Sequence, residues 1–497
     1  MFEVPALRVR ALVDRPWRSK GDHVVYWMTS TRRGGSNFAL QHAVARATQF
    51  DVPLIVLEAL RCDYPWASAR LHRFVLDGMQ DQRRWFEERG IAYHAYVEPE
   101  VGAGRGLIAA LAARACGVVT DEFPCFFLPR MLAAAAAKLA VRLESVDSNG
   151  LLPLRAAPTD FPTAYAFRRF LQKSLAPHVQ SAPLADALAD VRLPSGAVPE
   201  PIAKRWPMAS DELLRGAERA LAALPIEARV KPVELRGGER AALSAMRGFL
   251  DRKLVDYEEQ RNQPDARGTS GLSPYLHFGH IGVHQVLGEL ARREDWSPAR
   301  IAGVTHGRKS GWWNMSSMAE AFLDELVTWR ELGYVFCSRR ADYASYDALP
   351  AWALETLVEH ADDPRPALYS LEQFAAAHTH DALWNAAQTQ LVREGSIHNY
   401  LRMLWGKKVL EWSRTPREAL ATLIELNNRY ALDGRNPNSY SGIFWCLGRF
   451  DRPWPERKVF GKVRCMTSDS TAKKLDVSEY LARYSPPRER GLFERAE

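Results

Sequence analysis

The cysteines of the chain follow none of the patterns that indicate a disulfide framework or a zinc site. Six cysteines occur among 497 residues, with no CxxC pair and no Cys/His metal spacing, so no metal ligands are predicted. The chain also lacks an apolar run long enough for a signal peptide or a membrane helix. Its most apolar stretch, 132–141, is short and contains Lys138. These absences predict a soluble, cytoplasmic protein with no membrane association.

Internal repeats, low-complexity tracts and a strong charge imbalance are absent as well. The balance of 66 basic and 59 acidic residues leaves a net charge of +7, which permits a polyanionic partner without requiring one. A length of 497 residues exceeds what one hydrophobic core usually supports, so more than one domain is expected. The chain contains fifteen tryptophans, a high number for this length, and the faces of indole rings stack on flavins and nucleic-acid bases.

The first 150 residues alternate between apolar runs and helical stretches, which predicts βαβ units and a mostly parallel sheet. The predicted strands are 24–28, 53–60, 92–97, 117–122 and 141–147. The predicted helices are 37–49, 68–89, 104–115 and 127–140. No GxGxxG motif follows the first strand, where the sequence reads TSTRRGGSN. The domain is therefore expected to be Rossmann-like in shape without a nucleotide signature.

Prolines are dense from 151 to 235, which predicts a long connecting segment. From 236 the pattern is helical and stays so to about 430. The predicted organisation is an α/β domain at 1–150, an interdomain linker at 151–235 and an all-α domain at 236–497. Arginine and lysine are frequent after 446, and either a solvated end or a nucleic-acid face accounts for them.

Tryptophans at helical spacing are the most informative feature of the second half. Trp405 and Trp412 are seven residues apart and share a helix face, which Trp384 could meet from the preceding helix. Indoles in contact form a path for single electrons, and a redox cofactor would lie at its end. Spacing alone favours the alternative that these residues are ordinary core.

Two further segments carry site-like residues. The sequence GTSGLSP offers small residues and hydroxyls before a new helix, an arrangement that can hold a pyrophosphate, although an ordinary capped turn has the same composition. Glu325 and Trp329 lie four residues apart, so a carboxyl and an indole share one helix face. They could bind a flat heterocycle, but an exposed glutamate near a core tryptophan is the commoner case.

These segments belong to six motifs that occur in one order between about 250 and 480. The motifs are YxxxRNxP–GTSxLSPYLHFG, FLDELxxWREL, THDxLWNAAQ, RMxWxKKxLEW, LNxRYxLDGRxPN and DRPWxERxxFGKxR. Together they resemble the photolyase/cryptochrome superfamily, and specifically class II cyclobutane pyrimidine dimer photolyases. The resemblance implies an α/β domain followed by a helical domain that binds FAD, with the reduced anionic form active.

The resemblance assigns cofactor contacts residue by residue. The positions matching the part that holds the FAD phosphates are Tyr257, Thr269, Ser270, Gly271, Leu272 and Ser273. Arg402 and Asp433 match an ion pair beside the flavin ring, Asn427 matches the amide at the flavin nitrogen N5, and Asn438 is expected to touch the cofactor. Trp384, Trp405 and Trp412 match the chain that passes electrons to the flavin.

The resemblance also assigns substrate contacts. Glu325 matches the carboxyl that hydrogen-bonds the dimer, and Met403, Trp329 and Trp445 match residues that pack around it. Arg261, Asn262, Asp451 and Arg452 match polar and cationic positions at the lesion and the DNA backbone. The catalytic set implied is Glu325, Asn427, Arg402, Asp433 and Met403.

The sequence departs from the class pattern at several positions. Phe450 stands where the class usually has histidine, Cys465 replaces a usual tyrosine, and Asn399 a usual glycine. The segment 301–318 is longer than the usual connector. The run TSTRRGGSNF differs from the class near the first strand, which leaves an antenna chromophore of the deazaflavin or folate type an open question.

The implied function is light-driven repair of cyclobutane pyrimidine dimers by electron transfer from excited reduced FAD to a flipped-out dimer. UV-damaged DNA is the expected partner, and a monomer without an obligate protein partner is expected. One alternative is a cryptochrome-like blue-light photoreceptor, against which Glu325, Met403 and Asn427 argue. Another is repair of the (6-4) photoproduct, for which His277 and His398 would be the candidate histidines.

Overall fold

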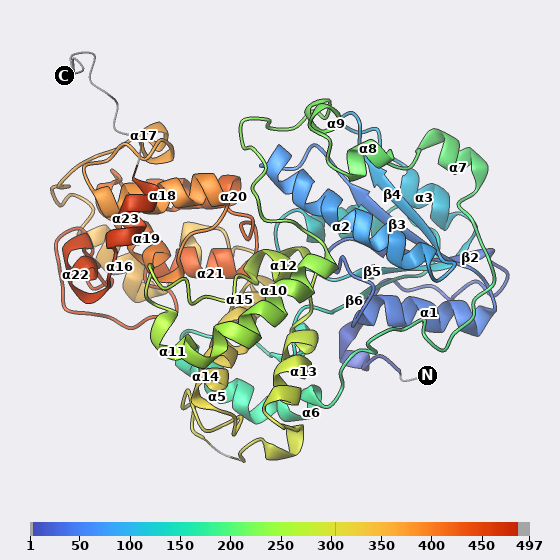
Figure 1. Cartoon of the computed structure of the whole chain (residues 1–497), viewed down its shortest axis with the longest axis horizontal. Helices are drawn as coiled ribbons and strands as arrows, with labels where there is room; N and C mark the ends of the chain where they lie inside the picture. The colour runs from blue at the N-terminus through green and yellow to red at the C-terminus, as the bar shows by residue number, and fades with distance from the viewer. Residues whose placement is uncertain (1–2, 304, 486–497) are drawn as a thin grey trace. The chain divides into compact units, whose positions relative to one another are not determined.

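The computed structural model describes residues 3–303 and 305–485. The chain forms two compact units, each assembled from several segments. Unit 1 comprises 1–258, 270–343 and 435–441, and unit 2 comprises 259–269, 344–434 and 442–497. The predicted order of an α/β part followed by a helical part is confirmed (Figure 1). The predicted domain boundaries at 150 and 235 stay a prediction.

Unit 1 contains a six-stranded sheet with the order β1-β6-β5-β2-β3-β4. All five predicted strands are present, and a short antiparallel edge strand, β1, is added by pairing with β6. The other neighbouring strands are parallel. The strands are β1 (Val9–Val13), β2 (His23–Met28), β3 (Leu54–Leu60), β4 (Ala92–Val97), β5 (Ala115–Asp121) and β6 (Leu143–Val146).

Helices cover both faces of this sheet because its central strands are apolar on both sides. Every residue of β2 is buried. One face packs Val25, Ile55 and Val118 against Leu111 and Leu132. The opposite face is covered by α1 and α2. The helices are α1 (Phe38–Phe50), α2 (Ala69–Glu87), α3 (Leu107–Ala112) and α4 (Leu128–Ala136).

Helix α3 is shorter than the predicted 104–115, and β5 begins earlier than the predicted 117. Gly106 precedes α3 in a left-handed conformation with φ of 91°, which glycine adopts without steric cost and which delays the helix. The apolar run after Ala113 pairs with the sheet instead of extending the helix. The short apolar segments around 112–117 fit either element, and the sheet pairing decides between them.

Several short helices follow the sheet, and Arg168 of α5 forms a buried ion pair of 2.9 Å with Asp324. They are α5 (Ala164–Ser174), α6 (Ala176–Val179), α7 (Glu200–Arg205), α8 (Asp211–Leu214) and α9 (Glu218–Ala222). The later helices of unit 1 are α10 (Glu239–Arg252), α12 (Ser273–Phe278), α13 (Val283–Arg293), α14 (Ser317–Leu323) and α15 (Arg330–Arg339). Between α14 and α15 the chain forms a π-helical segment, η5 (Asp324–Trp329).

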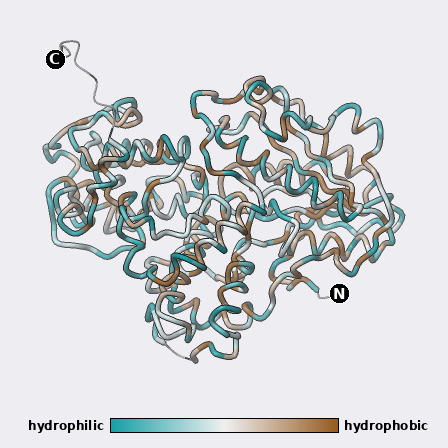
Figure 2. The backbone as a smooth tube through the Cα atoms, in the orientation of Figure 1, coloured by the Kyte–Doolittle hydropathy of each residue, from teal (hydrophilic) through white to brown (hydrophobic). Residues whose placement is uncertain are grey.

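Unit 2 is helical, and α19 packs between α18 and α20. Hydrophobic and hydrophilic stretches alternate along the helices (Figure 2), as expected where each buries part of its surface. The helices are α16 (Ala351–Glu359), α17 (Leu371–Ala375), α18 (Ala382–Glu394), α19 (Asn399–Trp412), α20 (Pro416–Tyr430), α22 (Ser468–Lys474) and α23 (Ser478–Tyr484). Helices α11 (Tyr257–Gln260) and α21 (Pro437–Cys446) each run from unit 1 into unit 2.

In the part of the chain that the structure describes, no helix combines the length and the apolar character needed to cross a bilayer.

Candidate functional site

A pocket lies at the carboxyl ends of the parallel strands in unit 1. Its lining includes residues that follow β2, β3 and β5, namely Thr29, Arg61 and Phe123. After the edge strand β1, the chain forms β2 in the interior of the sheet, adds β3 and β4 on one side of it, and then adds β5 and β6 on the other. The strand order therefore reverses at β2, and the crevice at such a switch point is where open α/β sheets bind ligands.

The side chain of Asp121, at the end of β5, holds the loop that follows β2. One carboxylate oxygen accepts hydrogen bonds from the backbone N–H groups of Thr29, Ser30 and Thr31, at 2.7, 2.8 and 2.9 Å. The other accepts the hydroxyl proton of Tyr26 at 2.8 Å. Asp121 is fully buried. This loop is the TSTRRGGSN segment, and its first residues line the pocket.

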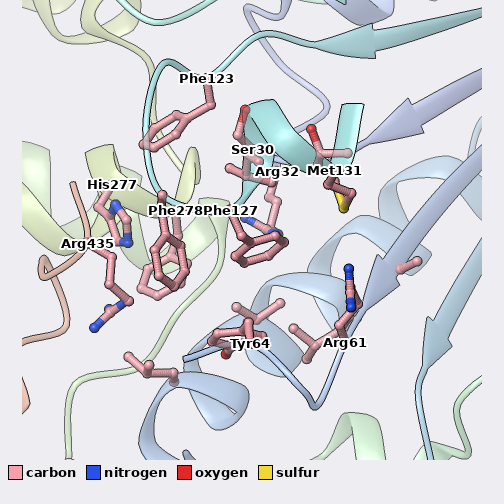
Figure 3. A pocket seen from close by; sticks show the side chains of 17 residues that line it. Ser30, Arg32, Arg61, Tyr64, Phe123, Phe127, Met131, His277, Phe278 and Arg435 are labelled. Carbon is pink, nitrogen blue, oxygen red and sulfur yellow. The ribbon is translucent and has the colours of Figure 1, made fainter. Parts of the chain in front are cut away.

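The pocket combines aromatic walls with positive charge. It encloses about 700 Å³ including its open mouth. Arg61 and Arg435 lie at two sides of the pocket, with Phe127 and Phe278 drawn between them in Figure 3. The lining contains three arginines and no carboxylate: Thr29, Ser30, Arg32, Ala59, Leu60, Arg61, Tyr64, Leu71, Val75, Phe123, Phe126, Phe127, Leu128, Met131, His277, Phe278 and Arg435.

At least two of the three arginines pair with carboxylates outside the lining, and one of these pairs joins Arg61 to Asp63 at 2.7 Å. Arg32 pairs with Glu58 at 3.2 Å, and burial raises the pKa of that carboxyl to about 7. Burial, together with the charges of Arg435 and Arg32, lowers the pKa of His277 well below its usual value. His277 is therefore neutral at pH 7 and adds no positive charge to the pocket.

Two residues that line the pocket, and Trp66 beside one of them, have backbone in a strained conformation. Trp66, Phe126 and Arg435 have φ values of 64°, 63° and 62°, a region that bulky residues rarely adopt. The rings of Trp66 and Phe126 stack with centroids 5.9 Å apart. Such strain persists where surrounding contacts fix it, and it is frequent at ligand sites.

The GTSGLSP segment begins a helix as predicted, because α12 starts at Ser273. Gly271 has φ of 68°, and a Cβ atom there would meet nothing within 4 Å. The backbone N–H of Leu272 donates to the Ser270 hydroxyl at 3.4 Å. Both Gly271 and Ser273 are exposed, so the hydroxyl of Ser273 is accessible. Tyr257, the other predicted phosphate-side residue in unit 1, is buried against Phe249 and Phe322.

Glu325 and Trp329 lie on η5, where the helix widens to a π-helical turn. Their spacing of four residues was expected on an α-helix, and the wider turn was not foreseen. π-Helical turns are rare and are frequently found at functional sites. Asn438, a predicted cofactor contact, donates its side-chain amide to the carbonyl oxygen of Trp329 at 3.2 Å. The structure thus brings Asn438 and Trp329 together in unit 1.

In unit 2 the predicted ion pair is present. Arg402 on α19 donates from Nη2 to both carboxylate oxygens of Asp433, at 3.1 and 3.3 Å. Asn427, near the end of α20, is 3% exposed and donates to the side chain of Asn428 at 3.3 Å. Met403 follows Arg402 on α19 and is half-buried.

The three predicted tryptophans form one connected group in unit 2. Trp384 stacks on Trp405 with centroids 6.4 Å apart and an interplanar angle of 7°, and meets Trp412 at 6.0 Å. The Trp384 indole N–H donates to the Trp405 carbonyl, and the Trp405 indole N–H donates to Gln388. Trp384 therefore lies between the two tryptophans of α19.

Two residues that the sequence did not single out extend this group. Trp412 is 1% exposed. Tyr369 and His380 contact it with centroids 5.6 and 5.0 Å away, and the Tyr369 hydroxyl lies 2.6 Å from Nδ1 of His380. His380 is exposed. It stands in the THDxLWNAAQ motif, which is the one sequence signal that could have identified it.

The predicted DNA-facing residues of unit 2 divide between two segments. Asp451 pairs with Arg464 at 3.0 Å, and its Oδ1 accepts the backbone N–H of Arg452 at 2.9 Å. Arg452 is exposed and lies over the Trp454 ring. Trp445 is half-buried, with Lys407 and Arg464 over its ring. Arg261 and Asn262 lie in a turn and are half-buried.

The chain is similar to known proteins over nearly its whole length. The chain is 34% identical to the deoxyribodipyrimidine photo-lyase of Methanothermobacter thermautotrophicus, covering 97% of this chain and 98% of that protein. It is 33% identical to the enzyme of the same name from Oryza sativa subsp. japonica, covering 95% and 90%. For Potorous tridactylus the identity is 31%, covering 98% and 86%. No family model matches the chain.

Solved structures of other proteins share the fold of this chain. A bacterial class III photolyase from Agrobacterium tumefaciens aligns with a TM-score of 0.67 at 18% identity, covering 94% of this chain and 86% of that chain. An archaeal photolyase from Sulfolobus tokodaii with two FAD molecules aligns with a TM-score of 0.65 at 13% identity, covering 95% and 91%. At these identities the likeness shows the fold alone.

We expect Asp121→Ala to destabilise unit 1 strongly, because it leaves three buried N–H groups and a tyrosine hydroxyl without an acceptor. The loss should be about 3–5 kcal/mol, measured by urea unfolding. Asp14→Ala is the control, because that side chain is 85% exposed in its pair with Arg142, and it should cost less than about 0.5 kcal/mol. Equal losses in the two variants would contradict the anchoring role of Asp121.

Proposed function

The chain belongs to the deoxyribodipyrimidine photo-lyases of the photolyase/cryptochrome superfamily, and from this we propose that it uses light to repair cyclobutane pyrimidine dimers in DNA. The observation that carries the proposal is the match to relatives of that name over at least 86% of both sequences. Glu325, Met403 and Asn427 are present at the positions that the resemblance assigns to repair.

The residues present suit FAD, the cofactor implied by the family. The Thr269, Ser270 and Ser273 hydroxyls and the N–H groups at the start of α12 are donors of the kind that phosphates bind. The guanidinium of Arg402 and the amide of Asn427 suit the polar edge of a flavin. FAD, when fully reduced and excited by blue light, supplies one electron to the dimer.

The residues of unit 2 would hold the cofactor in its reduced anionic form. The Arg402 guanidinium is oriented by Asp433, and its positive charge favours a neighbouring anion. Asn427 can hydrogen-bond a ring nitrogen without donating a proton as an acid would. In unit 1, Asn438 hydrogen-bonds the carbonyl oxygen of Trp329, and by the resemblance it would also contact the cofactor.

The substrate contacts follow from the same assignment. Glu325 would hydrogen-bond the carbonyl edge of the flipped-out dimer and stabilise charge there. The indoles of Trp329 and Trp445 and the thioether of Met403 offer apolar surfaces for the two pyrimidines. Arg261, Asn262 and Arg452, with Asp451 orienting the loop, would contact the lesion strand and its phosphates.

The connected tryptophans would carry electrons from the surface. Trp412 is buried, so an electron from the solvent would reach it through its contacts with Tyr369 and His380. Tyr369 is placed to give an electron to oxidised Trp412 while its hydroxyl proton passes to unprotonated Nδ1 of His380. The electron then continues from Trp412 through Trp384 to Trp405, in the order of their contacts.

The pocket in unit 1 is the proposed antenna site. Its aromatic walls suit a flat chromophore, and Arg32, Arg61 and Arg435 suit an anionic one. A deazaflavin, a folate with its glutamate tail, and a second flavin all meet these requirements, and the last accords with the two FAD molecules of the Sulfolobus tokodaii photolyase. A cytoplasmic monomer acting on UV-damaged DNA without a protein partner completes the proposal.

The decisive test uses photoreduced protein, an oligonucleotide with one thymine dimer, and blue light with a dark control. Light-dependent restoration of thymines, counted by chromatography, is expected. Glu325→Gln should lower the repair yield per absorbed photon by roughly two- to tenfold while leaving binding in the dark intact. The exposed Glu355 supplies the control variant, Glu355→Gln. No restoration with FAD bound and photoreducible would favour a photoreceptor or another lesion.

Replacing Trp405 by phenylalanine should interrupt the electron path, because phenylalanine is much harder to oxidise than tryptophan. We expect photoreduction of oxidised FAD to lose most of its rate, measured by the fall in flavin absorbance under illumination. Repair by chemically reduced enzyme should be unchanged. Trp313→Phe, a change of another buried indole, should leave photoreduction at the wild-type rate. Equal rates in all three proteins would remove Trp405 from the path.

The antenna proposal is tested by titrating the protein with a deazaflavin, methenyltetrahydrofolate and FAD in separate experiments. One of them should bind saturably beside the catalytic flavin and transfer excitation to it, measured by quenching of its fluorescence. Arg61→Glu should weaken that binding by roughly tenfold. Arg114→Glu reverses a charge that is 75% exposed in its pair with Asp22 and should have no effect. Equal affinity in both variants would place the chromophore elsewhere.

A further inference from the structure

Lys407 is a fully buried lysine in the middle of α19. It is 0% exposed, and burial lowers its pKa to about 8. Burying an ammonium group without a direct carboxylate partner is costly, so its contacts must compensate. Because no part of it reaches the surface, Lys407 cannot bind a DNA phosphate as the exposed arginines and lysines after residue 446 could.

The contacts of Lys407 are at the carboxyl end of α21. Its Nζ donates to the carbonyl oxygen of Cys446 at 2.7 Å and lies 3.5 Å from that of Trp445. The last carbonyl groups of a helix have no partner within the helix, and a cation there also complements the helix dipole. The ammonium lies 4.8 Å from the centroid of the Trp445 ring, within range of a cation–π interaction. Lys407 therefore contacts both the backbone and the indole of Trp445.

Two neighbouring features fix this arrangement. A Cβ atom at Gly406 would collide with Cys446 Sγ, so the glycine allows α19 to approach the end of α21. After the helix the chain turns sharply, with φ of 108° at Gly448 and 66° at Phe450. The turn leads to Asp451 and Arg452, the predicted lesion-side residues. The position of Lys407 thus affects the start of a constrained turn as well as Trp445.

Lys407 also lies four residues after Met403, so the two share a face of α19. Met403 and Trp445 are both assigned to the surface that packs around the dimer. We propose that Lys407 is a positioning residue for substrate recognition, which caps α21 and holds the Trp445 indole at a fixed place relative to Met403. This inference rests on the proposed function, because it gives Trp445 its role as a dimer contact.

The test is a double-mutant cycle between Lys407→Met and Trp445→Phe. Methionine keeps the length of the side chain and removes its donors and charge. The readout is the ratio of dissociation constants for undamaged DNA and for DNA with one thymine dimer, measured in the dark. We expect Lys407→Met to lower this ratio by roughly tenfold and to have little further effect when Trp445→Phe is already present. Lys407→Arg, which keeps donors and charge, should recover most of the discrimination.

A purely structural role predicts a different result. Lys407→Met would then lower the ratio by the same factor with and without Trp445→Phe, or not at all, and either result would overturn the inference. FAD content and the rate of flavin photoreduction should match the wild type, which separates loss of Trp445 positioning from damage to the cofactor region. If the methionine variant does not fold, Lys407→Gln is used in the same cycle with the same criteria.

Measurements of dimer binding and dimer repair by the wild-type protein distinguish failure of this inference from failure of the proposed function. A wild type that neither discriminates nor repairs the dimer would overturn both. A wild type that repairs dimers but shows an additive cycle would overturn the role of Lys407 alone.

Discussion

The burial of α19 on nearly all sides is the constraint on which the organisation of unit 2 depends. Nine of its residues are buried, including Trp405, Lys407 and Trp412. A helix enclosed in this way has no face reserved for solvent, so each turn contacts a different partner. Arg402 pairs with Asp433, Trp405 stacks on Trp384, and Lys407 binds the end of α21. The residues proposed to contact the cofactor, to carry electrons and to pack against the substrate are thereby oriented by the rotation of one helix about its axis.

This constraint explains why charged residues can occupy the interior of α19. The pair Lys407 and Lys408 would be expected on a solvent face from residue type alone. Lys407 instead donates to the Cys446 carbonyl, and Lys408 pairs with Glu411 at 2.8 Å. Each ammonium has a specific partner, which is the condition for burying it. A hydrophobic residue at position 407 would pack, but it would leave the carbonyl of Cys446 without a donor.

Features that depend on local pattern were predictable from the sequence. The apolar runs predicted β2 to β6, the Ser-Pro sequence predicted the start of α12, and the seven-residue spacing of Trp405 and Trp412 predicted that they share a helix face, which agrees with the contact of both with Trp384. The edge strand β1 was missed because it is short and has no fully buried residue, so its apolar signal is weak. The ion pair of Arg402 and Asp433 was expected only from resemblance, since residues 31 positions apart have no local signal of contact.

Features that arise from tertiary contact were not predictable. The π-helical turn of η5 has no signature in the sequence, and the Tyr369–His380 contact depends on a loop meeting α19.

The position of the pocket in unit 1 follows from the strand order of the sheet, whereas the residues that line the pocket cannot be predicted from that order. The TSTRRGGSN segment lacks the glycine spacing of a nucleotide-binding loop, yet it lies at the switch point of the sheet. Asp121, and not a set of glycines, fixes this loop, because one of its carboxylate oxygens accepts hydrogen bonds from three successive backbone N–H groups. Those N–H groups are then unavailable to a phosphate, so recognition in the pocket falls to aromatic faces and arginines. This is the physical basis on which a flat, anionic chromophore is proposed for this pocket.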